Sequence, residues 1–160
     1  MSAVLVSAVL VGVDIVESDR LARAAARGGT ILTRRLTTPA ERDRGPGPAA
    51  FSVKESLIKA VGLRPPGFTW HDFEALAAPP RGWAGRLMEE AAGELAASTG
   101  VRLSTGASYA VRGASARAAR ERLGPGTAAG AARWGEGGGL FVSLAIVYVE
   151  QALGEERSAS

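Results

Sequence analysis

The chain contains no cysteine and a single histidine, His71, and these two shortages exclude several kinds of site. Without cysteine there are no disulfides, thiolate zinc sites or thiol nucleophiles. With one histidine, a metal site built from several histidines cannot form. Any chemistry must therefore use oxygen and nitrogen groups, and we expect a protein of a reducing, cytoplasmic compartment.

Long hydrophobic runs are also missing. The opening apolar run, Ala3 to Val13, is too short to span a bilayer as a helix and has no basic segment before it. Its valine and leucine content, and the acidic residues Asp14 and Glu17 that follow, favour a buried strand. We expect no membrane partner, and we predict a single domain over residues 1–154 with a frayed tail at 155–160.

Lysine is scarce: Lys54 and Lys59 are the only two lysines, and the other basic residues are arginines. The chain has 19 basic and 16 acidic residues, which gives a net charge of +3. The excess of arginine is typical of a high-GC coding bias, and it also permits an acidic partner or a phosphorylated ligand. A nucleic-acid-binding domain would show steeply salt-dependent binding. No recognition motif supports that class, and we do not expect nucleic acid as a partner.

The hydrophobic pattern predicts an α+β domain in which a mixed or antiparallel sheet packs against a helix over Ala49–Val61. Strands are expected at residues 4–16, 68–76, 101–111 and 140–149. Other helices are expected at residues 17–27, from Thr38 onward, and at 83–98, with a loop at 45–48. Gly28 and Gly29 should end the first of them, with Ser18 available to cap its start.

The last third of the sequence gives a weaker pattern. From Gly113 it is rich in alanine, arginine and glycine, and no element is predicted before the strand at 140–149. The stretch Gly135 to Gly139 lacks the lysine and the serine or threonine of a P-loop, and it is interpreted as a loop.

Two patterns suggest chemistry without deciding it. Asp14 ends a hydrophobic strand, where a carboxylate is costly to bury unless a cation compensates its charge. Capping of the next helix or pairing with Arg20 would also explain a carboxylate at this position.

Glu55 and Lys59 are four residues apart and share one face of a predicted helix, with Lys54 nearby. A solvated salt bridge is the simpler interpretation, and a site for a metal-bound pyrophosphate is the alternative.

Three arginines, Arg20, Arg23 and Arg27, follow one another along one side of the first predicted helix. Such a stripe is usually solvated. It could also dock an acidic helix of a partner, because guanidinium groups pair well with carboxylates.

Four segments in order resemble the holo-acyl-carrier-protein synthase group of 4′-phosphopantetheinyl transferases. They are Gly12–Glu17 followed by Arg20, Leu36–Glu41, Phe51–Ala60 with its KExxxK pattern, and Trp70–Glu74. The resemblance implies the phosphopantetheinyl transferase fold. It also implies magnesium-dependent transfer of phosphopantetheine from coenzyme A to a serine of an apo acyl carrier protein, in fatty acid or polyketide biosynthesis.

The same resemblance assigns roles to individual residues. Asp14 and Glu55 would be the Mg²⁺ ligands, with Mn²⁺ as a possible substitute, and with Lys59 they would be the catalytic residues. Coenzyme A would contact Lys54, Lys59 and Ser104. The serine hydroxyl of the carrier would attack the β-phosphate, with Glu55 or a metal-bound water as its base.

The resemblance also implies partners, and the chain departs from it at one place. Arg20 and Arg27 would meet the acidic helix of the carrier protein, and a homotrimer would carry active sites between its subunits. Thr105, after Ser104, stands where the family places a histidine that helps to hold the nucleotide end of coenzyme A. That departure favours an alternative hypothesis, a catalytically silent module that binds carrier proteins.

Overall fold

The computed structural model describes residues 4–5, 8–43, 49–62 and 64–152. The strands are β1 (Val4–Leu5), β2 (Val9–Glu17), β3 (Phe73–Ala75), β4 (Thr105–Val111), β5 (Thr127–Gly137) and β6 (Leu140–Ala152). The helices are α1 (Ser18–Leu36), α2 (Pro39–Asp43), α3 (Ala49–Val61), α4 (Gly82–Thr99) and α5 (Gly113–Leu123), with a 3₁₀ turn, η1, at Trp70–Asp72. Among the residues described, no helix has the length and apolar character needed to cross a membrane.

The strands form one sheet in which every pairing is antiparallel, in the order β1-β6-β5-β4-β3, and β2 pairs with β6 beside β1. In this register Asp14 of β2 lies opposite Ser143 of β6. The structure therefore confirms the predicted α+β class, with an antiparallel sheet against the helix at Ala49–Val61.

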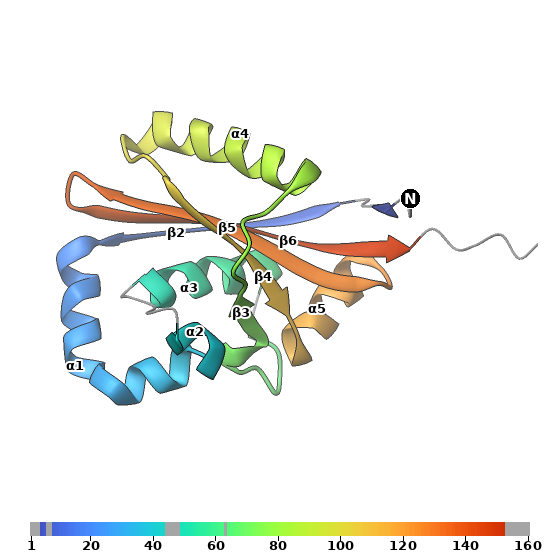
Figure 1. The fold of residues 1–160 in the computed structure, drawn as a ribbon, viewed down its shortest axis with the longest axis horizontal. Coiled ribbons are helices and arrows are strands. Elements are labelled where there is room, and N and C mark those ends of the chain that lie inside the picture. Colours follow the sequence, from blue (N-terminus) through green and yellow to red (C-terminus); the bar gives the residue numbers. More distant parts are fainter. Residues whose placement is uncertain (1–3, 6–7, 44–48, 63, 153–160) are drawn as a thin grey trace, which may run out of the picture.

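Helices cover both faces of the sheet (Figure 1): α4 lies on one face, and α1, α2, α3 and α5 lie on the other. The core on the α3 face joins Val53, Leu57 and Val61 to strand residues such as Tyr109 and Val147. The core on the α4 face is built from residues including Ala84, Met88, Val142, Leu144 and Ile146. Alternate residues of β6 thus enter the two cores, as the pleat of a strand requires, and this explains its almost continuous apolar sequence.

Helix α3 lies very close to β2 because of Gly12. A Cβ atom at this position would lie 2.0 Å from the carbonyl oxygen of Ser56 and 2.5 Å from the amide nitrogen of Ala60, both in the helix backbone. Only glycine allows this approach, and the approach brings Asp14, two residues later, beside α3.

Replacing Gly12 by alanine is expected to push α3 away from β2 and to lower the free energy of unfolding by about 1–3 kcal/mol, the usual cost of overpacking. Urea denaturation measures this change. Gly93→Ala is the control. Gly93 is exposed on α4, and a Cβ atom added there would meet no atom within 4 Å. Equal stability of Gly12→Ala and the wild type would contradict the close packing.

Asp72 connects the 3₁₀ turn to α5. Its carboxylate accepts hydrogen bonds from the amide of Ser115 at 3.2 Å and from the Ser115 hydroxyl at 2.8 Å, and it also takes part in a capping box with Thr69. At the other end of α5, Arg122 donates to the carbonyl oxygen of Val61 at 2.9 Å and so binds the C-terminus of α3. These contacts fix α5 against the elements that carry the candidate site.

Several predicted boundaries are wrong. The first helix continues past Gly28 to Leu36, although Gly29, with φ of 51° and ψ of −140°, interrupts it with a kink. Ser18 does not cap the helix, because Glu17 holds the cap position and makes no side-chain cap bond. The strand expected at 68–76 is reduced to β3, because the capping box formed by Thr69 winds the preceding residues into a turn.

Other predictions are confirmed or extended. Helices α3 and α4 lie where they were expected, and α2 begins at Pro39 with the expected cap, since Thr38 and Glu41 exchange hydrogen bonds of 3.0 and 3.3 Å. The strand expected at 101–111 begins only at Thr105, and the last strand extends to Ala152. The loop at 45–48 and the tail at 155–160 lie outside the described residues.

The region that gave no pattern contains helix α5 and strand β5. Gly135–Gly137, interpreted as a loop, belongs to the end of β5, and the turn to β6 is made by Gly138 and Gly139, whose φ angles are +58° and +79°. Strand β5 lies between β4 and β6 and is built mainly from small residues, of which Ala131 and Ala132 are fully buried and Gly130 faces Leu57 of α3, where an added Cβ atom would lie 3.3 Å from the leucine side chain.

Candidate active site

Asp14 is the centre of a polar patch between β2 and α3. Its Oδ1 accepts a salt bridge from Lys59 at 2.9 Å, and its Oδ2 accepts a hydrogen bond from the Ser52 hydroxyl at 2.7 Å. Because the Ser52 proton goes to Asp14, the contact of 3.0 Å between Ser52 and Ser143 is donated by Ser143. The Asp14 side chain is 15% exposed and Lys59 is 52% exposed, so the patch opens to solvent on the lysine side.

Glu55 lies one helical turn before Lys59 on the same face of α3, so it belongs to the same patch. Its Oε1 accepts a salt bridge from Arg64 at 3.0 Å. Of the three residues predicted to be catalytic, the structure therefore joins Asp14 to Lys59 and places Glu55 one helical turn from Lys59 on the same face of α3. It also gives each of the two carboxylates a cationic partner from the same chain.

Lys54 is placed differently from the prediction that it contacts coenzyme A. Its side chain is fully buried, and its ammonium donates to the Glu41 carboxylate at 2.7 Å, to the carbonyl oxygen of Trp70 at 3.2 Å and to that of Leu36. Burial lowers the pKa of Lys54 below its ordinary value of 10.5, and the hydrogen bond and charge of Glu41 oppose this change. In this arrangement Lys54 joins α1, α2 and η1 to α3, and it offers no group to a phosphate.

An aromatic pocket of about 450 Å³ lies beside Arg64, the residue that binds Glu55. It is lined by Arg35, Arg64, Phe68, Thr69, Trp70 and His71. The guanidinium of Arg64, which also binds Glu55, lies 4.9 Å from the ring centre of Trp70 and 5.6 Å from that of Phe68. We call this cavity the Arg64 pocket.

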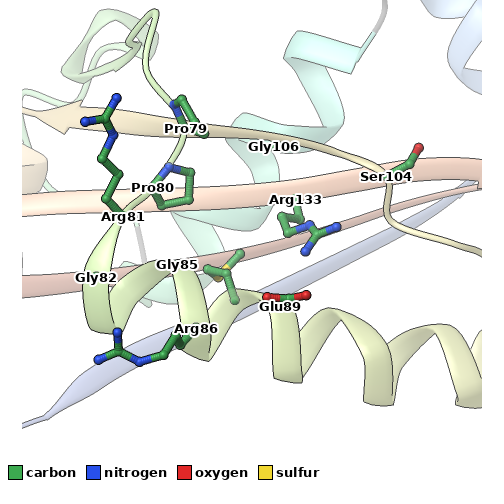
Figure 2. Close-up of a pocket in the computed structure, with 11 residues that line it drawn as sticks. Pro79, Pro80, Arg81, Gly82, Gly85, Arg86, Glu89, Ser104, Gly106 and Arg133 are labelled. Atoms are coloured by element: carbon green, nitrogen blue, oxygen red, sulfur yellow. The ribbon is translucent and has the colours of Figure 1, made fainter.

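Ser104 lies at a second cavity, of about 550 Å³, between the first turns of α4 and strands β4 and β5 (Figure 2). Glu89, Arg133 and Gly106 also line it. Since α4 and α3 cover opposite faces of the sheet, this cavity and the Asp14 patch lie on opposite faces of one chain. The predicted pairing of Ser104 with Lys59 on one coenzyme A molecule is therefore not formed within a single chain.

Arg20 and Arg27 lie on the first segment of α1, before the kink at Gly29, and both are exposed with Arg23 between them. Strand β2 runs directly into this helix, so Asp14 is four residues from its start. The arginine stripe therefore follows the polar patch directly along the chain. Ile31, on the segment after the kink, is 82% exposed.

The patch suits a hard divalent cation that is shared with a phosphate ligand. Mg²⁺ is commonly held by one or two carboxylates together with substrate phosphates and water, and Asp14 and Glu55 supply two carboxylates. In the part of the chain that the structure describes, no group of three acidic, histidine or cysteine residues could hold a metal by itself. The donor set therefore fits a cation that arrives with an anionic substrate.

Sequence reasoning missed three residues of this region. Ser52 lies one turn before Glu55 on α3, and its helical spacing could have revealed it. Arg64 follows the helix after Gly62 and gives no local signal. Glu41 was noted only as the end of the segment Leu36–Glu41, whereas its carboxylate accepts from the amide of Ala75 at 3.1 Å and binds Lys54.

Comparison with known proteins identifies the family. The family model of the 4′-phosphopantetheinyl transferase superfamily, ACPS, matches residues 10–110, which hold Asp14, Glu55 and Lys59. The chain belongs to the 4′-phosphopantetheinyl transferase superfamily. The predicted family is thereby confirmed.

Curated relatives match this chain over part of its length. The holo-[acyl-carrier-protein] synthase of Frankia alni is 44% identical over 71 residues, which cover 42% of this chain and 58% of the relative. That of Desulforudis audaxviator is 39% identical and is covered over 61% of its length. The chain thus spans about three fifths of these relatives. It spans 90% of the synthase of Geobacter sulfurreducens, with 34% identity over 113 residues.

Solved structures of the superfamily share the fold. The ACPS–CoA complex of Chronobacterium ammoniagenes superposes with a TM-score of 0.56, over 91% of this chain and 100% of the other, at 19% identity. At this identity the similarity establishes the fold of the phosphopantetheinyl transferase, including its α+β class.

Proposed function

We propose that this chain transfers 4′-phosphopantetheine from coenzyme A to a serine of an apo acyl carrier protein, as a holo-[acyl-carrier-protein] synthase. The observation that carries the proposal is the patch in which Lys59 of α3 binds Asp14 of β2, with Glu55 on the same face of α3, within the matched residues 10–110. Curated relatives with this name and a fold shared with an ACPS–CoA complex support it.

Asp14 and Glu55 are proposed to hold a divalent cation, Mg²⁺ by preference and Mn²⁺ as a substitute. When bound with the pyrophosphate of coenzyme A, the cation supplies charge neutralisation at the phosphate oxygens. Ser52 orients Asp14 through their hydrogen bond of 2.7 Å and so keeps one carboxylate oxygen in a fixed direction.

Lys59 is proposed to contact the transferred phosphate. Its ammonium is half exposed and is held by Asp14 at 2.9 Å, so it stays at the mouth of the patch without being desolvated. A positively charged donor there stabilises the negative charge that develops on the phosphate oxygens as the serine hydroxyl attacks and 3′,5′-adenosine bisphosphate leaves. Most of the catalysis assigned to this chain is positioning and electrostatic stabilisation.

The arginine stripe is proposed to bind the carrier protein. Arg20 and Arg27 are exposed on the helix that follows Asp14, and an acidic helix docked there would bring its serine to the patch. A homotrimer is proposed as the active form. It would explain why the Ser104 cavity lies on the opposite face of the sheet, since only a neighbouring chain could bring that face to a bound coenzyme A.

Intact-mass spectrometry tests the activity. An apo acyl carrier protein incubated with the chain, coenzyme A and Mg²⁺ is expected to gain the mass of one phosphopantetheine group. The gain should disappear when EDTA replaces Mg²⁺, and when the acceptor serine of the carrier is replaced by alanine. Failure with carriers from both fatty acid and polyketide synthesis would overturn the proposal, and a stable complex without transfer would favour a silent carrier-binding module.

A further inference from the structure

Arg64 occupies two environments at once. One nitrogen of its guanidinium donates to Glu55 at 3.0 Å, while the flat face of the group lies 4.9 Å from the ring centre of Trp70. The side chain is 52% exposed, so it can turn without unpacking the core. The bond to Glu55 is therefore weak enough to be exchanged, and the stacking on Trp70 would keep the guanidinium in place after the exchange.

The Arg64 pocket has the chemistry of a nucleotide site. Phe68 and Trp70 supply aromatic faces, which contact each other with ring centres 5.6 Å apart. Arg35 and Arg64 supply guanidinium groups, and none of the described residues that line the cavity is acidic. A planar base with an attached phosphate matches this combination, because bases stack on aromatic rings and phosphates pair with guanidinium groups.

The same guanidinium thus belongs to the Arg64 pocket and to the carboxylate proposed as a metal ligand. We propose that Arg64 is a positioning residue that couples the two: it holds Glu55 while the pocket is empty, and it turns to the phosphate of an adenine nucleotide bound in the pocket, which frees Glu55 for the metal. This inference rests on the proposed function of the patch. Metal and nucleotide then bind cooperatively, and each raises the affinity for the other by the same factor.

The first test measures binding of Mn²⁺ alone, from the electron paramagnetic resonance signal of the free ion. Arg64→Gln removes the competitor for Glu55, and it should bind Mn²⁺ about two- to fivefold more tightly than the wild type, the range expected from a half-exposed ion pair. Arg112→Gln is the matched control. Arg112 is 58% exposed and pairs with Glu74 at 3.2 Å, so its loss removes the same charge without touching Glu55.

The second test measures binding of 3′,5′-adenosine bisphosphate in EDTA by calorimetry. Arg64→Gln should weaken this binding severalfold, and Glu55→Gln should strengthen it because Arg64 is released. In the double variant the effect of Glu55→Gln should be largely lost. Such non-additivity distinguishes coupling through Arg64 from a general change in charge.

Three results would count against these expectations, and they separate the two proposals. Equal Mn²⁺ affinities in the wild type, Arg64→Gln and Arg112→Gln would overturn the role of Arg64 and leave the metal site intact. Additive effects of Glu55→Gln and Arg64→Gln on nucleotide binding would do the same. No Mn²⁺ binding by any folded variant, either alone or with 3′,5′-adenosine bisphosphate present, would overturn the metal site itself, and the coupling with it.

Discussion

Replacing Lys54 by methionine is expected to lower the free energy of unfolding by about 3–5 kcal/mol, although the residue is charged and the replacement is apolar. Its ammonium is buried against the Glu41 carboxylate at 2.7 Å. Removing the lysine alone leaves that carboxylate buried without a cation, and the carbonyl oxygens of Leu36 and Trp70 lose their donor. Urea denaturation at neutral pH measures the loss.

A second replacement identifies the cause. Glu41→Gln in the Lys54→Met background removes the uncompensated charge and keeps an oxygen that can accept from Thr38 and Ala75. The double variant should therefore be more stable than Lys54→Met alone, and its loss of stability should be smaller than the sum of the two single losses by a coupling energy of about 1–3 kcal/mol. A loss in the double variant equal to the sum of the two single losses would show that the charges are not coupled. The loss would then come from packing.

Replacing Asp14 by asparagine is expected to reduce the rate of phosphopantetheine transfer by about 10²–10³-fold, the usual effect of removing a group that stabilises transition-state charge. Asparagine keeps the shape of the side chain and can still accept from Ser52, but it lacks the charge for a cation and for Lys59. Glu55→Gln should have an effect of similar size, because it removes the other proposed ligand.

Both replacements should leave the fold intact, because each removes an ion pair to a half-exposed cation. Initial rates of carrier modification at saturating coenzyme A, beside urea denaturation curves, separate the effect on catalysis from any effect on stability. Glu121→Gln, an exposed carboxylate on α5, is the control and should leave the rate unchanged. Rates within twofold of the wild type for Asp14→Asn would remove Asp14 from the catalytic site.

Local sequence determined much of this protein. The amphipathic spacing from Ala49 to Val61 and the glycine that follows defined α3 completely, and Thr38 with Glu41 defined the start of α2, because both depend on neighbours within four residues. The spacing of Glu55 and Lys59 alone places them on one face of α3. The family resemblance then added Asp14 as their partner.

The remaining features depend on contacts between distant residues. Strand β5 could not be predicted from its alanine and glycine content, because its strand conformation comes from pairing with β4 and β6. Lys54 and Lys59 look equivalent on the helix, yet one is buried against Glu41 and the other reaches Asp14 at the surface. Which of them meets solvent is decided by α1, α2 and η1, which cover one side of α3 and leave the other open.

Sequence by itself therefore determined the local elements and the chemical groups on α3, since helix caps and helical spacing act over a few residues. Tertiary structure alone decided that Ser104 lies on the opposite face of the sheet from Asp14, and that Arg64 binds Glu55. The physical reason is that a side chain's partners depend on which elements pack around it, and packing is a property of the whole chain.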